Sequence, residues 1–215
     1  MKNRFAIPAT CSTLLLLCAF ALAQMPVQFS ADMVMTPGKA GGMATNGKFF
    51  FGGTKMRMEM NGGGQQMIMI TDLDRKVVDQ LMPQQQMYME HAMGQPMGGR
   101  GPAMPEIKAY DPNNPCSNDP DVTCRKVGTE MMNGRMCDKW EFTAKPGTHG
   151  STRTLWIDHS TRIPIKTAMP DGMTMEFKNI KEGAQSASLF QVPPGYQKMD
   201  LGNMMRGMRP PKGDD

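Results

Sequence analysis

The chain has 215 residues, a formal net charge of +4, 20% charged residues and 26 methionines. This length allows one domain or two small ones. The hydrophobic fraction of 40% excludes a bundle of membrane helices, and the small charge without a Lys/Arg run excludes a nucleic-acid-binding protein. Methionine, at more than one residue in nine, is the outlier that a functional account has to explain.

Residues 1–23 have the pattern of a secretory signal peptide. Lys2 and Arg4 precede a short apolar run over 14–22, and Ala21-Leu22-Ala23 supplies small residues for cleavage after Ala23. The alternatives are a membrane anchor, for which the run is short, and a lipoprotein, for which Leu17 before Cys18 is unsuitable. We therefore expect a secreted protein, periplasmic in a bacterium, whose mature chain starts near Gln24.

The rest of the chain alternates apolar and polar residues at period two, which is typical of half-buried strands. Glycine, proline and aspartate clusters separate the runs and indicate tight turns. About ten short strands are predicted, at 27–35, 48–51, 55–61, 66–71, 76–82, 86–90, 125–132, 135–144, 152–158, 163–168 and 173–180, and Ser188 to Val192 is a further candidate to close the sheet. Short helical pieces are considered near 105–110 and 182–187.

Two segments lack this alternation. A flexible Gly/Pro/Met loop and a cysteine loop are predicted over 92–124, and a disordered tail over 200–215. The remaining 24–199 is expected to be a single β-rich domain. Successive hairpins require antiparallel pairing, and a sheet of so many strands curls. The predicted fold is therefore mainly β: a curled antiparallel sheet, either a half-barrel or an open barrel, with few short helices.

Three cysteines remain after the signal peptide. Asn133-Gly134 is typical of a two-residue hairpin turn, which pairs Met132 with Arg135 and Glu130 with Cys137. This places Cys124 roughly 20 Å along its strand from Cys137. We therefore predict a Cys116–Cys124 disulfide across a polar loop with Cys137 free, and Cys116–Cys137 remains the alternative.

Short motifs spread along the chain resemble the LolA-like group of secreted lipoprotein-carrier and lipid-binding domains. They are Gly128-Thr129-Glu130 with Asn133-Gly134, Trp156-Ile157-Asp158, Pro164-Ile165-Lys166, and Leu189-Phe190 with Val192-Pro193-Pro194-Gly195-Tyr196. The resemblance covers roughly 29–199. It implies a curled antiparallel sheet whose concave face holds acyl chains, but it identifies no lipoprotein-binding residues in this sequence.

No catalytic motif is recognisable. The histidines His91, His149 and His159 lie outside any nucleophile or metalloprotease signature, and paired acids such as Asp72 and Asp74 are explained by turn chemistry. Cys137 is interpreted as a strand cysteine without a catalytic role. We therefore expect neither an enzyme nor a cofactor.

The strand methionines have three interpretations: core filler, an adaptable apolar cavity, or ligands of Cu(I). The cavity hypothesis predicts that the protein binds a lipid, an acyl chain or another hydrophobic molecule. It also allows an envelope protein as a partner. Its candidate residues are Met56, Met58, Met60, Met67, Met69, Met87, Met89, Trp156 and Met175.

Two other functions stay open. Met87, Met89, His91 and Met93 lie within seven residues and are candidate Cu(I) ligands for a periplasmic copper-binding protein. The remaining alternative is a structural envelope protein without a small ligand, in which methionine fills the core or consumes oxidants.

Overall fold

The computed structural model describes residues 27–39, 41–62, 64–93, 109–148 and 151–199. The expected signal peptide, the tail over 200–215 and most of the expected Gly/Pro/Met loop lie outside these residues. No helix in the described part of the chain is long and apolar enough to cross a membrane.

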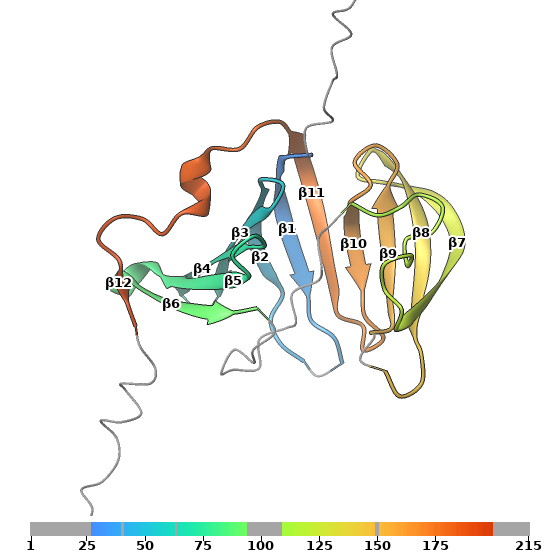
Figure 1. Ribbon diagram of the computed structural model, residues 1–215, viewed down its shortest axis with the longest axis horizontal. Coiled ribbons are helices and arrows are strands. Elements are labelled where there is room, and N and C mark those ends of the chain that lie inside the picture. The colour runs from blue at the N-terminus through green and yellow to red at the C-terminus, as the bar shows by residue number, and fades with distance from the viewer. Residues whose placement is uncertain (1–26, 40, 63, 94–108, 149–150, 200–215) are drawn as a thin grey trace, which may run out of the picture.

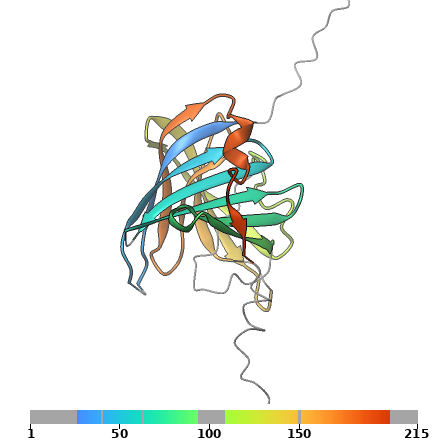
Figure 2. The same cartoon turned by 90° about the vertical axis from the view of Figure 1, so that its left-hand side faces the viewer.

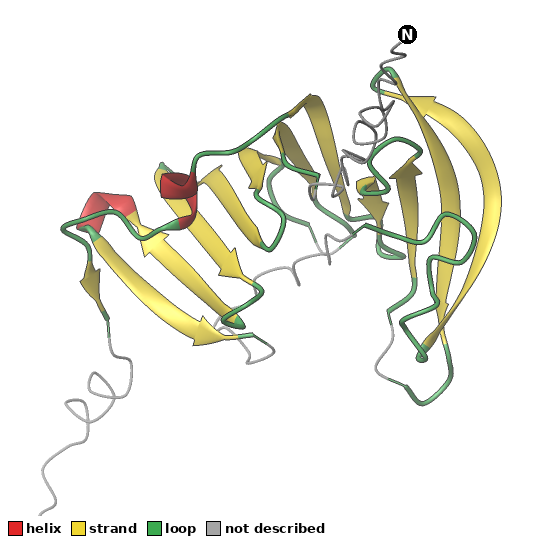
Figure 3. Ribbon diagram, turned by 45° about the horizontal axis from the view of Figure 1, so that its top comes forward, coloured by secondary structure: helices red, strands yellow, loops and turns green. Residues whose placement is uncertain are grey.

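The described chain forms one open, curled sheet of twelve strands in the order β12-β6-β5-β4-β3-β2-β1-β11-β10-β9-β8-β7 (Figure 1). The strands are β1 Phe29–Thr36, β2 Thr45–Phe51, β3 Lys55–Gly62, β4 Gln65–Asp72, β5 Val77–Met82, β6 Met87–Ala92, β7 Val122–Met132, β8 Arg135–Ala144, β9 Arg153–Asp158, β10 Pro164–Ala168, β11 Thr174–Glu182 and β12 Gln197–Lys198. Two single-turn helices complete it, η1 Pro83–Gln85 and η2 Ala187–Phe190 (Figure 3). The predicted fold class is confirmed.

Neighbouring strands pair antiparallel except at one edge, where β12 runs parallel to β6. In this order, strands β1 to β6 form one half of the sheet and strands β7 to β11 form the other half. Strand β11 then returns to pair with β1 in the middle of the sheet. Strand β7 is the other edge, so the sheet does not close into a barrel among the described residues.

The predicted hairpin at Asn133-Gly134 is confirmed. Met132 pairs with Arg135 and Glu130 with Cys137, and both turn residues have positive φ, as this type of turn requires. The hairpin tip also reaches back to the sheet, where the Asn133 side-chain amide donates to the backbone oxygen of Phe177 at 3.1 Å. This contact holds the β7–β8 hairpin against β11.

The disulfide prediction is also confirmed: Cys116 is bonded to Cys124 and Cys137 is free and buried. The loop that the disulfide closes leads into β7 and packs over one of the core clusters. That cluster contains Tyr110, Val122, Trp140, Phe142, Leu155 and Ile157, with both bonded cysteines against it.

Removing this bridge is expected to destabilise the protein. The cysteines are eight residues apart, and closing so short a loop contributes about 2–3 kcal/mol in the chain-entropy account. A Cys116→Ser/Cys124→Ser variant should lose that much free energy of unfolding in urea denaturation. A Cys116–Cys137 peptide in a map of the unreduced protein would contradict the assignment.

One predicted strand is wrong. Ser188 to Val192 does not close the sheet, because Ala187–Phe190 forms the single-turn helix η2. The apolar side chains of this stretch instead pack onto the face of the sheet. Further along the chain, the two residues of β12 pair with β6. Figure 2 shows the backbone of this C-terminal segment running across the strands.

Candidate functional site

One face of the sheet carries most of the strand methionines, and we call it the methionine face. Its centre is a core cluster from strands β1 to β5 and β11, in which Met33, Met56, Met58, Met69 and Met175 are buried with phenylalanines. Phe49 stacks on Phe177 with ring centroids 4.6 Å apart, and Phe29 lies against both. This centre is a packed core.

The strand register aligns methionines in rows across this face. Directly opposed pairs are Met58 with Met69, Met60 with Met67, Met82 with Met87, and Met35 with Met175. Residues opposed in this way have Cβ atoms about 5 Å apart. Methionines therefore recur on this face from β1 and β11 to β6, with phenylalanines of β2 and Gln80 of β5 between them.

The surface changes from buried to accessible along these rows. Met60, Met87 and Met89 are half-buried, and Met67 is 37% exposed. The side-chain amide of Gln80 donates to the Met67 sulfur at 3.7 Å. Strands β3 to β6 thus present unbranched apolar side chains that are not fully packed.

The structure therefore brings eight of the nine candidate cavity residues onto one face. Their alternation along β3, β4 and β6 correctly predicted that these methionines share a face, which Met33, Met35 and Met82 also share. Whether any of these residues contacts a ligand stays a prediction.

Trp156 is the exception, because it lies on the opposite face. Its neighbour Leu155 belongs to the cluster under the disulfide loop, whereas Trp156 packs with Cys137 and Ile165. The ammonium groups of Lys139 and Lys166 lie 4.9 and 5.0 Å from its ring, and its indole nitrogen donates to Glu130. Trp156 does not line the methionine face.

Several polar atoms on the methionine face are buried without a hydrogen-bond partner. They are Nε2 of His91, Oγ1 of Thr71 and Oγ1 of Thr167. Thr71 and His91 both pair with Val78, a member of the methionine-face core, which places them in one row. Unpaired buried polar atoms are costly and frequently mark a functional position.

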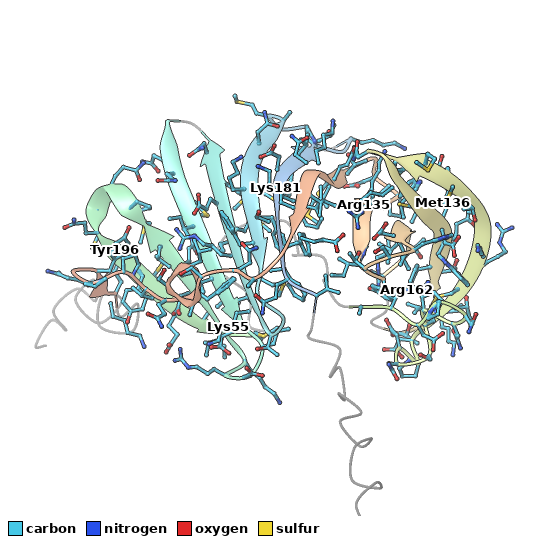
Figure 4. The ribbon with its side chains drawn as sticks, turned by 90° about the horizontal axis from the view of Figure 1, so that it is seen from above. Lys55, Arg135, Met136, Arg162, Lys181 and Tyr196 are labelled. Atoms are coloured by element: carbon cyan, nitrogen blue, oxygen red, sulfur yellow. A yellow bond between two sulfur atoms is a disulfide. The ribbon has the colours of Figure 1, made fainter. Side chains whose placement is uncertain are left out.

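The opposite face is covered by the C-terminal segment. Phe190, Leu189 and Tyr196 pack there with the β4–β6 residues Ile68, Ile70, Leu81 and Tyr88. Arg57 donates to the Leu189 backbone oxygen at 3.0 Å, and Lys198 pairs with Glu90 at 2.7 Å. Figure 4 shows Tyr196 over the β6 side of the sheet and Lys181 near its middle. Sequence reasoning missed this packing.

The most deeply buried ion pair lies at the other end of the opposite face. Asp158, whose side chain is 3% exposed, accepts a hydrogen bond from Arg135 at 2.9 Å and two from Thr161, at 2.8 Å from its backbone and 2.7 Å from its hydroxyl. Burial opposes ionisation of Asp158, but these donors outweigh it and hold its pKa below the usual value. Arg135 also contacts Glu182 at 2.5 Å, so the guanidinium joins the β8–β9 and β11 regions.

The remaining titratable groups do not form an evident catalytic centre within the described residues. Burial raises the pKa of the Cys137 thiol to about 12, so this cysteine is protonated and unreactive. Asp138 has its pKa lowered to about 2, because hydrogen bonds from Lys126, His159 and Thr129 outweigh the opposing effect of burial. Among the described residues, no group of three or more His, Cys, Asp or Glu side chains is arranged to hold a metal ion.

Fold and site together define a class: an open, curled β-sheet protein with an apolar, methionine-lined face. The chain matches the family described as domain of unknown function DUF4412 over residues 29–162, and it belongs to that family. No curated protein matches the chain.

Solved structures resemble it at low identity. An uncharacterized conserved protein from Thermus thermophilus aligns with a TM-score of 0.53 and 11% identity, over 82% of this chain and 91% of that one, and shares its fold. MucB in complex with MucA(peri) aligns with a TM-score of 0.49 and 14% sequence identity, over 83% of this chain and 58% of the MucB chain. A LolA superfamily protein from Nitrosomonas europaea aligns with a TM-score of 0.35 and 9% sequence identity, over 79% of this chain and 91% of that one. This chain thus spans less than two thirds of MucB.

Proposed function

We propose that this protein binds a hydrophobic ligand, a lipid or an acyl chain, on the methionine face outside the cytoplasm. The observation that carries the proposal is the extent of apolar surface on that face. A packed core of buried methionines borders the half-buried Met60, Met87 and Met89 and the exposed Met67, with Gln80 as the polar side chain between Met69 and Met89.

The side-chain type supports this role. Methionine is unbranched, has three rotatable bonds and a polarizable sulfur, and therefore adapts to ligands of different shape. Four directly opposed methionine pairs give a surface that rearranges without steric conflict between branched side chains. Leucine, isoleucine or valine at these positions would specify one rigid packing.

Two features support a location outside the cytoplasm. The Cys116–Cys124 disulfide is typical of proteins that fold in an oxidising compartment. Residues 1–23, which lie outside the described part, have the sequence pattern of a signal peptide. A periplasmic location in a bacterium is part of the proposal.

The proposed activity is non-covalent binding without catalysis. The strongly perturbed acids Asp138 and Asp158 are each held by several donors of the protein itself, and the free thiol of Cys137 is buried. These groups stabilise the fold and lie away from the accessible methionines of β3–β6.

The test places a charge on the accessible part of the surface. Met67→Glu, alone and with Met60→Glu, puts carboxylates where an acyl chain would lie, and an unpaired charge in an apolar site is costly. Binding of a fluorescent fatty-acid probe that unlabelled palmitate displaces should weaken at least about tenfold, which corresponds to 1.4 kcal/mol.

The control is Met131→Glu, because Met131 is 60% exposed on β7, far from β4 in the strand order. This variant should bind the probe as the unchanged protein does. Thermal unfolding of each variant separates lost binding from lost folding. Equal weakening by Met131→Glu, or full binding by the folded Met67→Glu variant, would contradict the proposed surface.

A further inference from the structure

Strand β6, next to the two-residue edge strand β12, presents an imidazole between thioethers. Met87 pairs with Met82, Met89 with Gln80 and His91 with Val78, so all three side chains point to the methionine face. Alternate residues of a strand are about 6.6 Å apart. Met93 follows directly after the strand and is exposed.

His91 is chemically unusual on this face. Its Nε2 atom is buried and has no hydrogen-bond partner. The other described histidine, His159, instead has Nε2 2.7 Å from the carboxylate of Asp138. A buried imidazole nitrogen without a partner retains its full capacity to bind a ligand, and a metal ion is the common one.

The surroundings select the type of metal. The neighbouring donors on this face are the sulfurs of Met87 and Met89, and the only acid of the strand, Glu90, points to the opposite face, where it pairs with Arg75 and Lys198. Uncharged, soft thioether ligands favour Cu(I), whereas Zn²⁺, Mg²⁺ and Ca²⁺ prefer thiolate, imidazole or oxygen ligands.

The edge position gives these side chains room to converge. Strand β12 pairs only with Met87 and Tyr88, so the rest of β6, Met89 to Ala92, has no strand neighbour on that side among the described residues. The methionines are half-buried or exposed and not held in the central core. The thioether chains of Met89 and Met93, which flank His91, are therefore free to turn toward one metal ion, whereas Met87 lies about 13 Å from His91 along the strand.

We propose that His91 and the thioethers of Met89 and Met93 bind one Cu(I) ion on strand β6 of the methionine face, with Met87 two residues beyond Met89. The site includes methionines of the accessible surface but lies on β6, two strands from β4, whereas the acyl-chain test is made at Met60 and Met67 on β3 and β4. No electron transfer is involved: the ion binds as Cu(I) and is released as Cu(I).

The experiment is an anaerobic Cu(I) titration of the full secreted chain in competition with bicinchoninate, a chromophoric Cu(I) chelator. We expect one Cu(I) per chain, with nitrogen and sulfur scatterers in the X-ray absorption spectrum. His91→Gln and the double variant Met87→Leu/Met89→Leu should each weaken binding at least about tenfold, because each removes a ligand and keeps side-chain size.

The matched control is Met131→Leu/Met136→Leu. These methionines form a directly opposed, exposed pair on β7 and β8, and the neighbouring imidazole, His159, has its Nε2 held by Asp138. The control should leave Cu(I) binding unchanged. Loss of Cu(I) in this control, or unchanged affinity in the folded His91→Gln variant, would overturn the proposal.

The two proposals fail independently. Met67→Glu should weaken fatty-acid binding and leave Cu(I) affinity unchanged, and His91→Gln should weaken Cu(I) binding and leave fatty-acid binding unchanged. If His91→Gln removed both ligands while the protein stayed folded, a separate copper site would be wrong.

Discussion

Replacing Asp158 by alanine is expected to lower the free energy of unfolding by about 3 kcal/mol, because it leaves the Arg135 guanidinium with only the more exposed Glu182 carboxylate and leaves the Thr161 donors without their acceptor. Arg135 and Thr161 donate three hydrogen bonds to this carboxylate, two of them from Thr161. Loss of Asp158 also leaves the turn between β9 and β10 without its acceptor. Urea denaturation at neutral pH measures the effect.

The pH dependence provides an internal check. The pKa of Asp158 is lower in the folded protein than its usual value, so its contribution is fully present above the pKa of the unfolded chain, about 3.9. The contribution is lost as the pH falls through the folded-state value. The difference in stability between the protein and Asp158→Ala should therefore shrink in acid.

A surface ion pair serves as the control. Arg125 and Glu141 are 2.6 Å apart on β7 and β8, and their side chains are 74% and 43% exposed. Glu141→Ala should cost less than about 1 kcal/mol, since solvent screens such pairs. Equal effects at Asp158 and Glu141 would show that burial of the Asp158–Arg135 pair does not determine its contribution.

Local rules predicted much of the sheet from the sequence. Asn133-Gly134 fixes a two-residue turn, the turn fixes the β7–β8 register, and that register separates Cys124 from Cys137. Each step depends only on neighbouring residues and on strand geometry. This register excluded a Cys124–Cys137 bridge, and the polar loop between Cys116 and Cys124 favoured the pairing that the structure shows.

Elements set by tertiary contacts were harder to predict. Strand β2 begins at Thr45, three residues before the predicted start, and includes Gly47. A Cβ atom at Gly47 would lie 2.1 Å from the backbone oxygen of Glu59, so this glycine permits a close approach of β2 and β3. From sequence alone, such a glycine is indistinguishable from a turn residue.

In the candidate site, too, features set by local alternation were predictable, whereas features set by tertiary contacts were not. Period-two alternation placed the methionines of β3, β4 and β6 correctly on one face. Trp156 was assigned from its amphipathic character, which does not indicate a face, and the register places it opposite. The partnerless Nε2 of His91 depends on its three-dimensional surroundings, so no sequence pattern reveals it.

Phe49→Ala is expected to destabilise the protein by about 3 kcal/mol, at the lower end of the range for removing a buried phenylalanine side chain, because its cluster contains flexible methionines besides the rings of Phe29 and Phe177. Phe49 is fully buried, and its cross-strand partner is Met58. Flexible neighbours move into the space that the ring leaves, and the cost of a cavity falls with the volume that is refilled.

Phe142 is the matched comparison, because it is equally buried in a cluster that contains no methionine. Its neighbours are tyrosine, tryptophan, valine, leucine and isoleucine, which are branched or rigid. Phe142→Ala should therefore cost more, about 4–5 kcal/mol, and urea denaturation of both variants measures the difference. If Phe49→Ala is the more costly change, the methionine face is as rigid as an ordinary core. The adaptability on which acyl-chain binding depends would then be absent at its centre, and only the half-buried methionines of β3–β6 would be left to supply it.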